Sequence, residues 1–376
     1  MHTIEVENVT KEFGSLVAVE DANFQIKDGE FVSILGPSGS GKSTILRMVA
    51  GFETPTTGSI AIEGNEVVGV PPFERNSNMV FQNLALFPHL TVAENIEYGL
   101  KQANVDKETR QKRVSEMLET VRLEGYGDRQ PDELSGGEQQ RVALARAIVN
   151  EPAVVLFDEP LASLDRKLRQ HMQFELQRIQ AETGITFLYV THDQDIALSI
   201  SDRMIVLNEG AIQQIGTVEE LYNAPMSQFV ADFLGDLNAI PSTITDLSEE
   251  YVTLDTSEGT IDIELDAGGR NENLIHSDGL AEGEPVNLCL RPHEISLQTE
   301  PPGDGQPSVT GTVKSRMFRG NEIAYIIETR WDEFLVIEDA GNEQLTNGTP
   351  VHLTWSRAGT YLFTPANGTK PNPKPA

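Results

Sequence analysis

The segment from Gly36 to Ser43 combines glycines with a lysine and a serine at the spacing of a phosphate-binding loop. It follows the apolar run Phe31–Leu35, which predicts a buried strand, and precedes Thr44–Met48, which predicts a helix. Backbone N–H groups of such a loop wrap phosphates, and the N-terminus of the helix adds positive potential. A chance glycine turn is the alternative, and the strand–loop–helix order argues against it. The expected nucleotide-binding residues here are Gly36, Pro37, Ser38, Gly39, Ser40, Gly41, Lys42, Ser43 and Thr44.

Within this loop, Lys42 is expected to reach the β and γ phosphates, and Ser43 to bind Mg²⁺. Two acids, Asp158 and Glu159, end another apolar run that starts at Ala153. A carboxylate at the tip of a buried strand is costly to desolvate without a partner, and Mg²⁺ is a natural one. Asp158 is therefore expected to act on the metal and Glu159 to polarise the attacking water. The alternative is two acids that cap a strand end before Pro160.

A second anion-binding pattern lies at Ser135, Gly136 and Gly137, directly before a strongly helical stretch that ends near Ala147. Serine is a favoured N-cap, and the free N–H groups of the first helical turn can hold an anion. One phosphate group needs only one such cradle. A head-to-tail dimer, in which the second cradle closes on the partner's nucleotide, explains the pair. A simply capped helix is the alternative.

The elements around these motifs alternate between strand-like and helix-like segments. The apolar run Thr186–Val190 is a further buried strand, and Leu168, Met172, Leu176 and Ile179 recur near helical spacing before it. Strand, helix and strand in this order predict a parallel sheet covered by helices.

Past Leu237, short strand-like runs occur at Val286–Leu290, Ile323–Ile327 and Val351–Trp355, separated by turn residues. We therefore expect an α/β nucleotide-binding domain followed by an all-β barrel or sandwich. The expected divisions are residues 1–235, with a helical subdomain at about 85–150, then 236–364, then a disordered tail at 365–376.

The chain has 376 residues with 28 basic and 58 acidic side chains, a formal net charge of −30. Such a surface repels phosphate backbones, so we expect no nucleic acid partner. No run approaches the ~20 apolar residues that span a bilayer, and the N-terminus does not have the pattern of a secretory signal. The single cysteine, Cys289, excludes an internal disulfide and fits a reducing compartment.

These motifs, in this order, resemble the nucleotide-binding subunits of ABC transporters over residues 1 to about 235. Residues 36–43 match Walker A, 134–138 the signature motif, 154–159 Walker B and 163–165 the D-loop. The resemblance implies a P-loop NTPase fold, ATP and Mg²⁺ as ligands, and roles for three more residues. Gln82 matches a glutamine that serves catalysis and the metal, His192 matches the switch histidine, and Phe13 matches the aromatic that stacks on adenine.

The implied catalytic residues are Glu159, His192 and Gln82, and the implied metal ligands are Ser43, Gln82 and Asp158. From the residues alone, Phe13 could instead be a core aromatic and His192 a strand-end cap. One position departs from the family: residue 138 is glutamate where glutamine is commonest. We expect altered tuning near the partner's nucleotide and no loss of hydrolysis.

Gly235–Asn238 and Leu290–Glu294 resemble the C-terminal oligonucleotide-binding-like (OB-like) regulatory region of bacterial importer ATPases. Those relatives import polyamines, ferric iron, sulfate or maltose, and this chain looks most like the spermidine/putrescine group. The implied partners are a second copy of the chain, two transmembrane permease subunits and an extracytoplasmic solute-binding protein. The apolar run Leu84–Leu90 would be core by composition. The resemblance implies instead a surface groove for a permease, at the cytoplasmic face of the membrane.

Two hypotheses of other kinds stay open at this stage. The chain could be a soluble ABC ATPase that acts on nucleic acid or the ribosome, although it has one nucleotide domain and no evident basic patch. The C-terminal region could also bind a small regulatory ligand, such as the transported solute.

Overall fold

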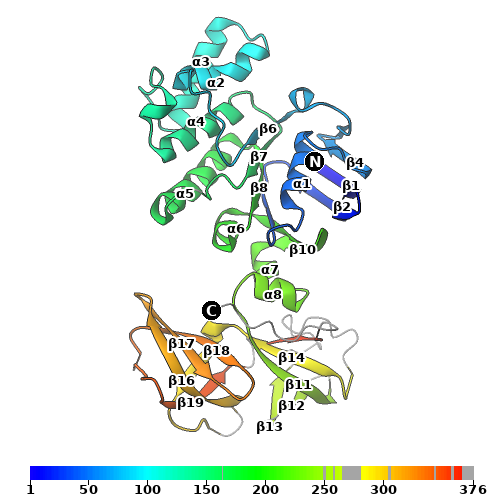
Figure 1. The fold of residues 1–376 in the computed structure, drawn as a ribbon, viewed down its shortest axis with the longest axis vertical. Helices are drawn as coiled ribbons and strands as arrows, with labels where there is room; N and C mark the ends of the chain where they lie inside the picture. The colour runs from blue at the N-terminus through cyan, green and yellow to red at the C-terminus, as the bar shows by residue number, and fades with distance from the viewer. Residues whose placement is uncertain are drawn as a thin grey trace. The chain divides into compact units, whose positions relative to one another are not determined.

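The structure is a computed structural model that describes residues 1–162, 164–248, 251–256, 259–264, 281–303, 306–342, 344–356 and 360–365. They belong to two compact units, Met1–Val218 and Glu219–Ala376, each described here by itself (Figure 1). In the described part of the chain, no helix has the length and apolar character needed to cross a membrane. Ser163 of the D-loop and residues 366–376 of the expected tail lie outside the described residues.

The first unit begins with an antiparallel sheet in the order β2-β1-β4-β5. Alternating apolar residues on β1 and β2 point to one face, where Ile4, Val6, Phe24 and Ile26 are buried. The strands of this sheet are β1 (His2–Phe13), β2 (Leu16–Lys27), β4 (Thr57–Ile62) and β5 (Asn65–Glu66).

A second sheet forms the centre of this unit, in the order β10-β9-β3-β8-β7-β6, and is parallel from β9 to β6. This confirms the parallel sheet expected from the sequence. Side chains on its strands alternate between two cores: Phe31, Phe157 and Phe187 face one, and Ile34 and Leu156 face the other. The strands are β3 (Phe31–Leu35), β6 (Ser77–Val80), β7 (Val154–Asp158), β8 (Thr186–Thr191), β9 (Arg203–Asn208) and β10 (Ala211–Thr217).

Helices cover both faces of this sheet. Helix α1 packs with the antiparallel sheet on one face, and α2, α4, α5 and α6 pack on the other, where their apolar residues share a core with Phe157 (Figure 1). Helices α2–α4 lie in the range expected for the helical subdomain. The helices are α1 (Lys42–Ala50), α2 (Val92–Gln102), α3 (Lys107–Thr120), α4 (Gly136–Ile148), α5 (Arg166–Thr183) and α6 (Gln194–Ile200), with 3₁₀ turns η1 (Pro72–Glu74) and η2 (Pro131–Glu133).

In its described residues, the second unit is all-β apart from two short helices and a 3₁₀ turn, η3 (Pro292–Glu294), which confirms the expected change of fold class. Two antiparallel five-stranded sheets, β13-β12-β11-β14-β20 and β15-β19-β16-β17-β18, share one core that includes Tyr325, Phe334 and Trp355. The strands are β11 (Asn238–Leu247), β12 (Tyr251–Thr256), β13 (Gly259–Glu264), β14 (Pro285–Leu290), β15 (Ile295–Gln298), β16 (Ser308–Phe318), β17 (Glu322–Glu328), β18 (Glu333–Asp339), β19 (Pro350–Trp355) and β20 (Thr360–Phe363).

The division between the units falls after Val218, earlier than the boundary expected at 235. One side chain that joins these residues to the second unit is Arg291, which is 1% exposed and donates hydrogen bonds of 3.1 Å to the carbonyl oxygens of Tyr222, Ala231 and Gly235. These carbonyls belong to the segment of α7 (Val218–Asn223) and α8 (Gln228–Phe233), so the arginine attaches both helices to the β domain.

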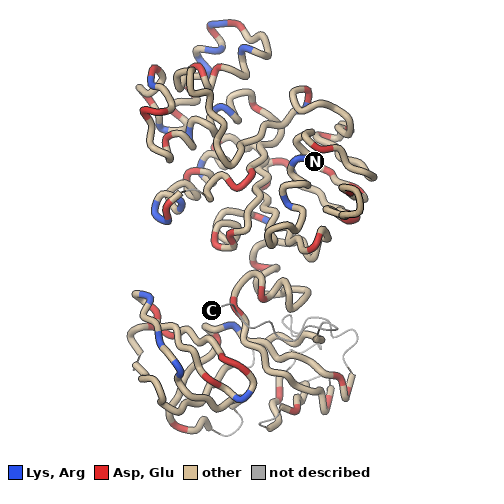
Figure 2. Tube along the Cα trace, in the orientation of Figure 1, with Lys and Arg blue, Asp and Glu red and all other residues tan. Residues whose placement is uncertain are grey.

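Acidic residues occur throughout both units, in keeping with the net charge of −30 (Figure 2).

Candidate functional site

The phosphate loop lies where the sequence predicted it, between the end of β3 at Leu35 and the start of α1 at Lys42. Gly41, directly before the helix, has a φ of 101°, which side-chain-bearing residues rarely adopt. A Cβ on Gly41 would also stand 2.4 Å from the carbonyl oxygen of Ala18. Both the loop's path and its approach to β2 therefore require glycine at this position.

Lys42 lies inside the loop and is only 6% exposed. Its ammonium donates hydrogen bonds to the carbonyl oxygens of Gly36 (2.8 Å) and Pro37 (2.7 Å). Burial lowers the pKa of Lys42, and the negative charges of Glu159 and Asp158 oppose that shift. The amine thus lies in the loop's own concavity, with two carboxylates close enough to act on its charge.

Two hydroxyls of the loop fit the binding of a phosphate and a metal. The Ser40 hydroxyl is buried and has no hydrogen-bond partner among the described residues. An unmatched buried hydroxyl costs free energy that a phosphate oxygen would recover. The Ser43 hydroxyl donates to Oδ1 of Asp158 at 3.0 Å, so the two side chains expected on Mg²⁺ lie together. Hard oxygen donors of this kind suit Mg²⁺.

Glu159 and His192 form a second pair at the same edge of the sheet. His192 follows β8 and Glu159 follows β7, and Nδ1 of the histidine lies 2.9 Å from Oε1 of the glutamate. Glu159 has a φ of 48°, a strained conformation for a residue other than glycine. The structure thus brings Lys42, Ser43, Asp158, Glu159 and His192 to one edge of the parallel sheet, although these roles remain predictions.

Phe13 and Gln82 lie on the surface of the first unit. The Phe13 ring is 46% exposed at the end of β1, which excludes the alternative of a core aromatic. Gln82 is exposed in the turn after β6, which the Leu84 N–H closes by donating to the Phe81 carbonyl at 2.9 Å. Among the described residues, no hydrogen bond or ion pair joins either side chain to the phosphate loop, and their roles in nucleotide and metal binding remain predictions.

The sequence did not point to Lys11, whose ammonium lies 4.7 Å from the centre of the Phe13 ring. A signal was present: residues two apart on a strand share a face, so a lysine two positions before an exposed aromatic can reach over it. The same ammonium pairs with Glu53 at 3.1 Å and donates to the Thr54 carbonyl at 2.8 Å, so it is held in place beside an exposed ring that suits a stacked base.

The second cradle is intact at the start of α4, where Ser135 is the N-cap. Its backbone N–H and its hydroxyl both donate to Oε2 of Glu138 at 2.7 Å, and the Glu138 N–H donates to the hydroxyl at 3.4 Å. These bonds lower the pKa of Glu138, the side-chain bond from Ser135 most of all. Within the described residues, no hydrogen bond joins this cradle to the phosphate loop of its own chain.

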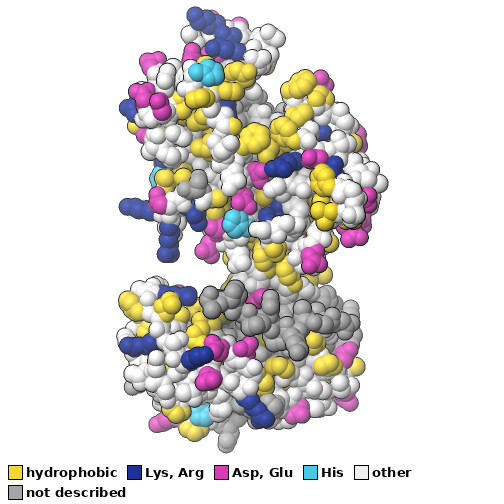
Figure 3. Space-filling model, in the orientation of Figure 1, with side chains coloured by type: hydrophobic (Ala, Val, Ile, Leu, Met, Phe, Trp, Pro, Cys, Tyr) yellow, Lys and Arg dark blue, Asp and Glu magenta, His cyan; other side chains and the backbone are white. Residues whose placement is uncertain are grey.

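The apolar run after Gln82 is divided between core and surface. Leu84 and Leu86 pack partly against the core under the helices, whereas Ala85 and Pro88 are exposed. The nearby Phe52 ring is exposed and lies 5.9 Å from the half-buried Phe81 ring, and Figure 3 shows apolar side chains gathered on this unit. An exposed apolar patch of this kind fits a protein partner.

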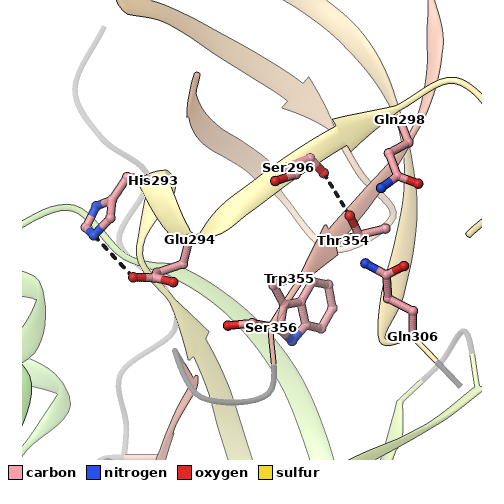
Figure 4. A pocket seen from close by; sticks show the side chains of 8 residues that line it. All are labelled: His293, Glu294, Ser296, Gln298, Gln306, Thr354, Trp355 and Ser356. Atoms are coloured by element: carbon pink, nitrogen blue, oxygen red, sulfur yellow. Dashed lines mark hydrogen bonds and ion pairs between the residues drawn. The ribbon is translucent and has the colours of Figure 1, made fainter. Parts of the chain in front are cut away.

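The second unit has a polar pocket of about 320 Å³ (Figure 4). Glu294 lies beside His293 at 3.5 Å, and the Thr354 hydroxyl bonds the Ser296 carbonyl. The buried Nε1 of Trp355 has no acceptor among the described residues. The pocket's lining is His293, Glu294, Ser296, Gln298, Gln306, Thr354, Trp355 and Ser356.

Comparison with known proteins adds two family matches. A family model described as ABC transporter matches residues 19–162, and one described as TOBE domain matches residues 288–363. The chain is 42% identical to the spermidine/putrescine import ATP-binding protein PotA of Thermobifida fusca, over 96% of this chain and 93% of that protein. It is 44% identical to the protein of the same name from Acidothermus cellulolyticus, over 95% and 91%. PotA 1 of Pseudomonas aeruginosa is also 44% identical, over 86% of each chain.

Two solved structures resemble the first unit. One is a dimeric ATP-binding cassette in a post-hydrolysis state bound to ADP and Pi, with 36% identity and a TM-score of 0.50. The match covers 57% of this chain and 98% of the chain of that cassette. The other is cbiO1 from Clostridium perfringens, part of an ABC transporter complex, with 30% identity, a TM-score of 0.55 and coverage of 58% and 90%.

Proposed function

This chain belongs to the ABC transporter family of ATP-binding proteins, and on that premise we propose that it is the ATP-hydrolysing subunit of a spermidine/putrescine importer. The observation that carries the ATPase is the meeting of the phosphate loop, Asp158 and the Glu159–His192 pair at one sheet edge. Near-full-length likeness to polyamine import proteins supports the cargo over ferric iron, sulfate or sugar. The net charge of −30 speaks against a soluble ATPase that acts on nucleic acid.

In the proposed mechanism, Lys42 leaves the Gly36 and Pro37 carbonyls and donates to the phosphates of ATP. Ser43, Asp158 and Gln82 would hold Mg²⁺, which supplies charge neutralisation at the phosphates when bound. Glu159 polarises the attacking water, and His192 holds the carboxylate in place through its 2.9 Å contact. Phe13 stacks on adenine, and Lys11 adds a positive charge beside that ring.

Two copies of the chain would close head to tail over two nucleotides, each site completed by Ser135, Gly136 and Gly137 of the partner. ATP then favours the closed dimer, and hydrolysis reopens it. The exposed Phe52 ring and the half-buried Phe81 ring before Gln82 would contact one of two permease subunits at the cytoplasmic face of the membrane. An extracytoplasmic solute-binding protein would deliver the polyamine to those permeases.

The test is Glu159→Gln, which keeps size and removes the carboxylate that polarises water. We expect hydrolysis to fall by about 100-fold or more and a stable ATP-bound dimer to appear in size-exclusion chromatography. The same substitution at Glu182, an acid on the exposed end of α5, is the control. Unchanged turnover in Glu159→Gln would overturn the mechanism.

The cargo is tested in vesicles that hold the complete transporter. ATP-dependent uptake of labelled spermidine or putrescine is the expected result. Uptake of sulfate, ferric iron or maltose in its place would refute the polyamine assignment and leave the ATPase assignment standing.

A second role is supported by the polar pocket of the C-terminal unit, whose lining includes the carboxylate of Glu294 and the polar side chains of Ser296 and Thr354. A small polar solute that binds there would adjust ATPase activity. The expected result is that added polyamine changes the ATPase rate of the wild-type chain and that Glu294→Gln loses this response. An equal response in both chains would exclude this pocket.

A further inference from the structure

Arg146, near the end of α4, binds the loop that follows Gln82. Its guanidinium donates to the carbonyl oxygens of Leu84 at 2.8 Å and Ala85 at 2.7 Å. The same group lies 5.3 Å from the ring centre of Phe87. One side chain therefore holds three residues of a loop that belongs to a different part of the chain.

The backbone held by Arg146 is strained. Leu84 has a φ of 60° and Ala85 a φ of 47°, both left-handed and both in residues other than glycine. Such conformations persist only where surrounding contacts enforce them, and they concentrate at functional sites. The two hydrogen bonds from Arg146 are contacts of that kind, because they end on the carbonyls of the two strained residues.

This strained pair closes the turn that carries Gln82. The Leu84 N–H donates to the Phe81 carbonyl at 2.9 Å, and the Ala85 N–H donates to the Asn83 carbonyl at 2.6 Å. Gln82 lies within this turn, so its backbone can shift only if Leu84 and Ala85 shift too. The next part of the loop is held by α2, where buried Asn95 accepts from the Phe87 N–H at 2.9 Å.

We propose that Arg146 is a positioning residue that couples Gln82 to the second anion cradle. Helix α4 carries Ser135, Gly136 and Gly137 at one end and Arg146 in its last turn, about 15 Å away along the axis. When a phosphate binds the first turn of α4, the helix shifts. The hydrogen bonds from Arg146 to Leu84 and Ala85 then displace the turn that contains Gln82. The inference rests on the proposed function, because it takes Gln82 as a metal contact.

Arginine suits this task better than lysine does. Its planar fork offers several N–H donors in fixed directions and can bind two neighbouring carbonyls at once. A lysine keeps the charge but presents a single flexible ammonium. Arg146→Lys therefore removes the fixed geometry while it keeps a cation in place.

The experiment measures the Mg²⁺ dependence of ATP hydrolysis by the full chain and, without turnover, the Mg²⁺ dependence of ATP-driven dimerisation in the Glu159→Gln background, where the same shift is expected. For Arg146→Lys we expect the Mg²⁺ concentration at half-maximal rate to rise about ten-fold and kcat to fall, with the KM for ATP little changed. Arg75→Lys is the matched control, since Arg75 is buried and donates to the carbonyls of Met48 and Val49 at 2.7 Å. It should lose stability without a shift in Mg²⁺ dependence. Equal Mg²⁺ curves for Arg146→Lys and Arg75→Lys would overturn the proposal.

Two further variants separate this inference from the proposed function. Ala85→Gly relieves the left-handed strain with Arg146 intact and should give a smaller shift in the same direction; no shift counts against the proposal. Gln82→Ala should raise the Mg²⁺ requirement, and adding Arg146→Lys to it should change little more. Independent, additive shifts would overturn the role of Arg146. If Gln82→Ala alone leaves the Mg²⁺ curve unchanged, the metal role in the proposed function is what fails.

Discussion

The two anion cradles of this chain are both helix N-termini, but they differ in how their free N–H groups are treated. Helix α1 starts at Gly41 with no side-chain cap and no acid in its first turn. Helix α4 starts at Ser135 with a full capping box and Glu138 in its first turn. A capped helix is stable without a ligand, whereas an uncapped one leaves donors free for an anion.

This contrast indicates that the two cradles differ in how readily they bind a phosphate. In the proposed function, the first cradle would keep its donors for a phosphate of its own nucleotide, and Lys42 lies inside it. In the second cradle, the Ser135 hydroxyl donates to the Glu138 carboxylate. To bind a phosphate of the partner, the hydroxyl would have to break this hydrogen bond, and the phosphate would then lie near the negative charge of Glu138. The first site is expected to bind strongly and the second to bind conditionally, as a site that opens in each cycle requires.

The largest effect is expected for Lys42→Ala, which breaks the first cradle. The variant loses the cation that meets the developing charge on the phosphates, so ATP hydrolysis should fall by about 100-fold or more. Steady-state ATPase assays measure this, and circular dichroism checks the fold. A rate within a few-fold of wild type would show that the buried lysine does not serve the phosphates.

Replacing one glycine of each cradle with alanine tests how strictly each backbone requires glycine. Gly41→Ala meets a φ of 101° and a carbonyl oxygen at 2.4 Å, so it should destabilise the chain by about 1–3 kcal/mol. Gly136→Ala meets only the Leu164 side chain, at 3.8 Å, and should shift the unfolding free energy by less than about 1 kcal/mol.

Gly136→Ala should act instead on ATP-dependent dimerisation of the Glu159→Gln chain. The added methyl group lies at the second cradle and should weaken that dimerisation. Denaturant unfolding and size-exclusion chromatography give the two readouts. Equal stability losses at Gly41 and Gly136 would remove the distinction between the cradles.

Glu138→Gln tests the charge at the second cradle. Without the carboxylate, the Ser135 hydroxyl is released more easily, so the ATP concentration that half-saturates dimerisation of the Glu159→Gln chain should fall several-fold. Glu94→Gln is the matched control, because Glu94 forms the same capping box with Thr91 at the start of α2, where no nucleotide is proposed. The idea fails if both substitutions act alike.

The smallest expected effect is on acid stability. Hydrogen bonds from Ser135 hold the pKa of Glu138 below its ordinary value of 4.5. The unfolded chain then binds more protons at this group, so the stabilising contribution is present above about pH 4.5 and is lost as pH falls through the lower folded pKa. The stability difference between wild type and Glu138→Gln should therefore shrink as pH falls from 6 to about 3. A constant difference in urea titrations would show that Glu138 does not titrate in this way.

The sequence allowed the chemical residues to be predicted better than their surroundings. The strand–loop–helix context of Lys42 and the strand-end position of Asp158 depend on local patterns, and the structure places both as expected. The exposure of Phe13 could not be decided from sequence, because an aromatic in a hairpin suits either core or surface. The sequence shows that residue 138 is glutamate and not glutamine. Only the structure shows that this carboxylate accepts a hydrogen bond from the Ser135 hydroxyl.

Contacts between distant segments were not predictable. In the sequence, Arg146 is one of several polar residues on a predicted helix. No pattern around it predicts hydrogen bonds to the carbonyls of Leu84 and Ala85. The same holds for Arg291, which binds carbonyls of the two preceding helices within the second unit, a unit that begins at Glu219 and not at 236. Backbone carbonyls carry no residue-specific signal, so side chains that bind them leave no pattern to find.

The buried position of Arg291 also sets an order of events during synthesis. Ala231 leaves the ribosome 60 residues before the arginine that binds its carbonyl. At bacterial elongation rates of roughly 5–20 residues per second, that gap lasts about 3–12 s. The nucleotide-binding unit, which ends at Val218, can fold within that time, while α7 and α8 still lack the side chain that anchors them. The first unit of each new chain can therefore fold before the strands that complete the second unit, which end at Phe363, have been synthesised.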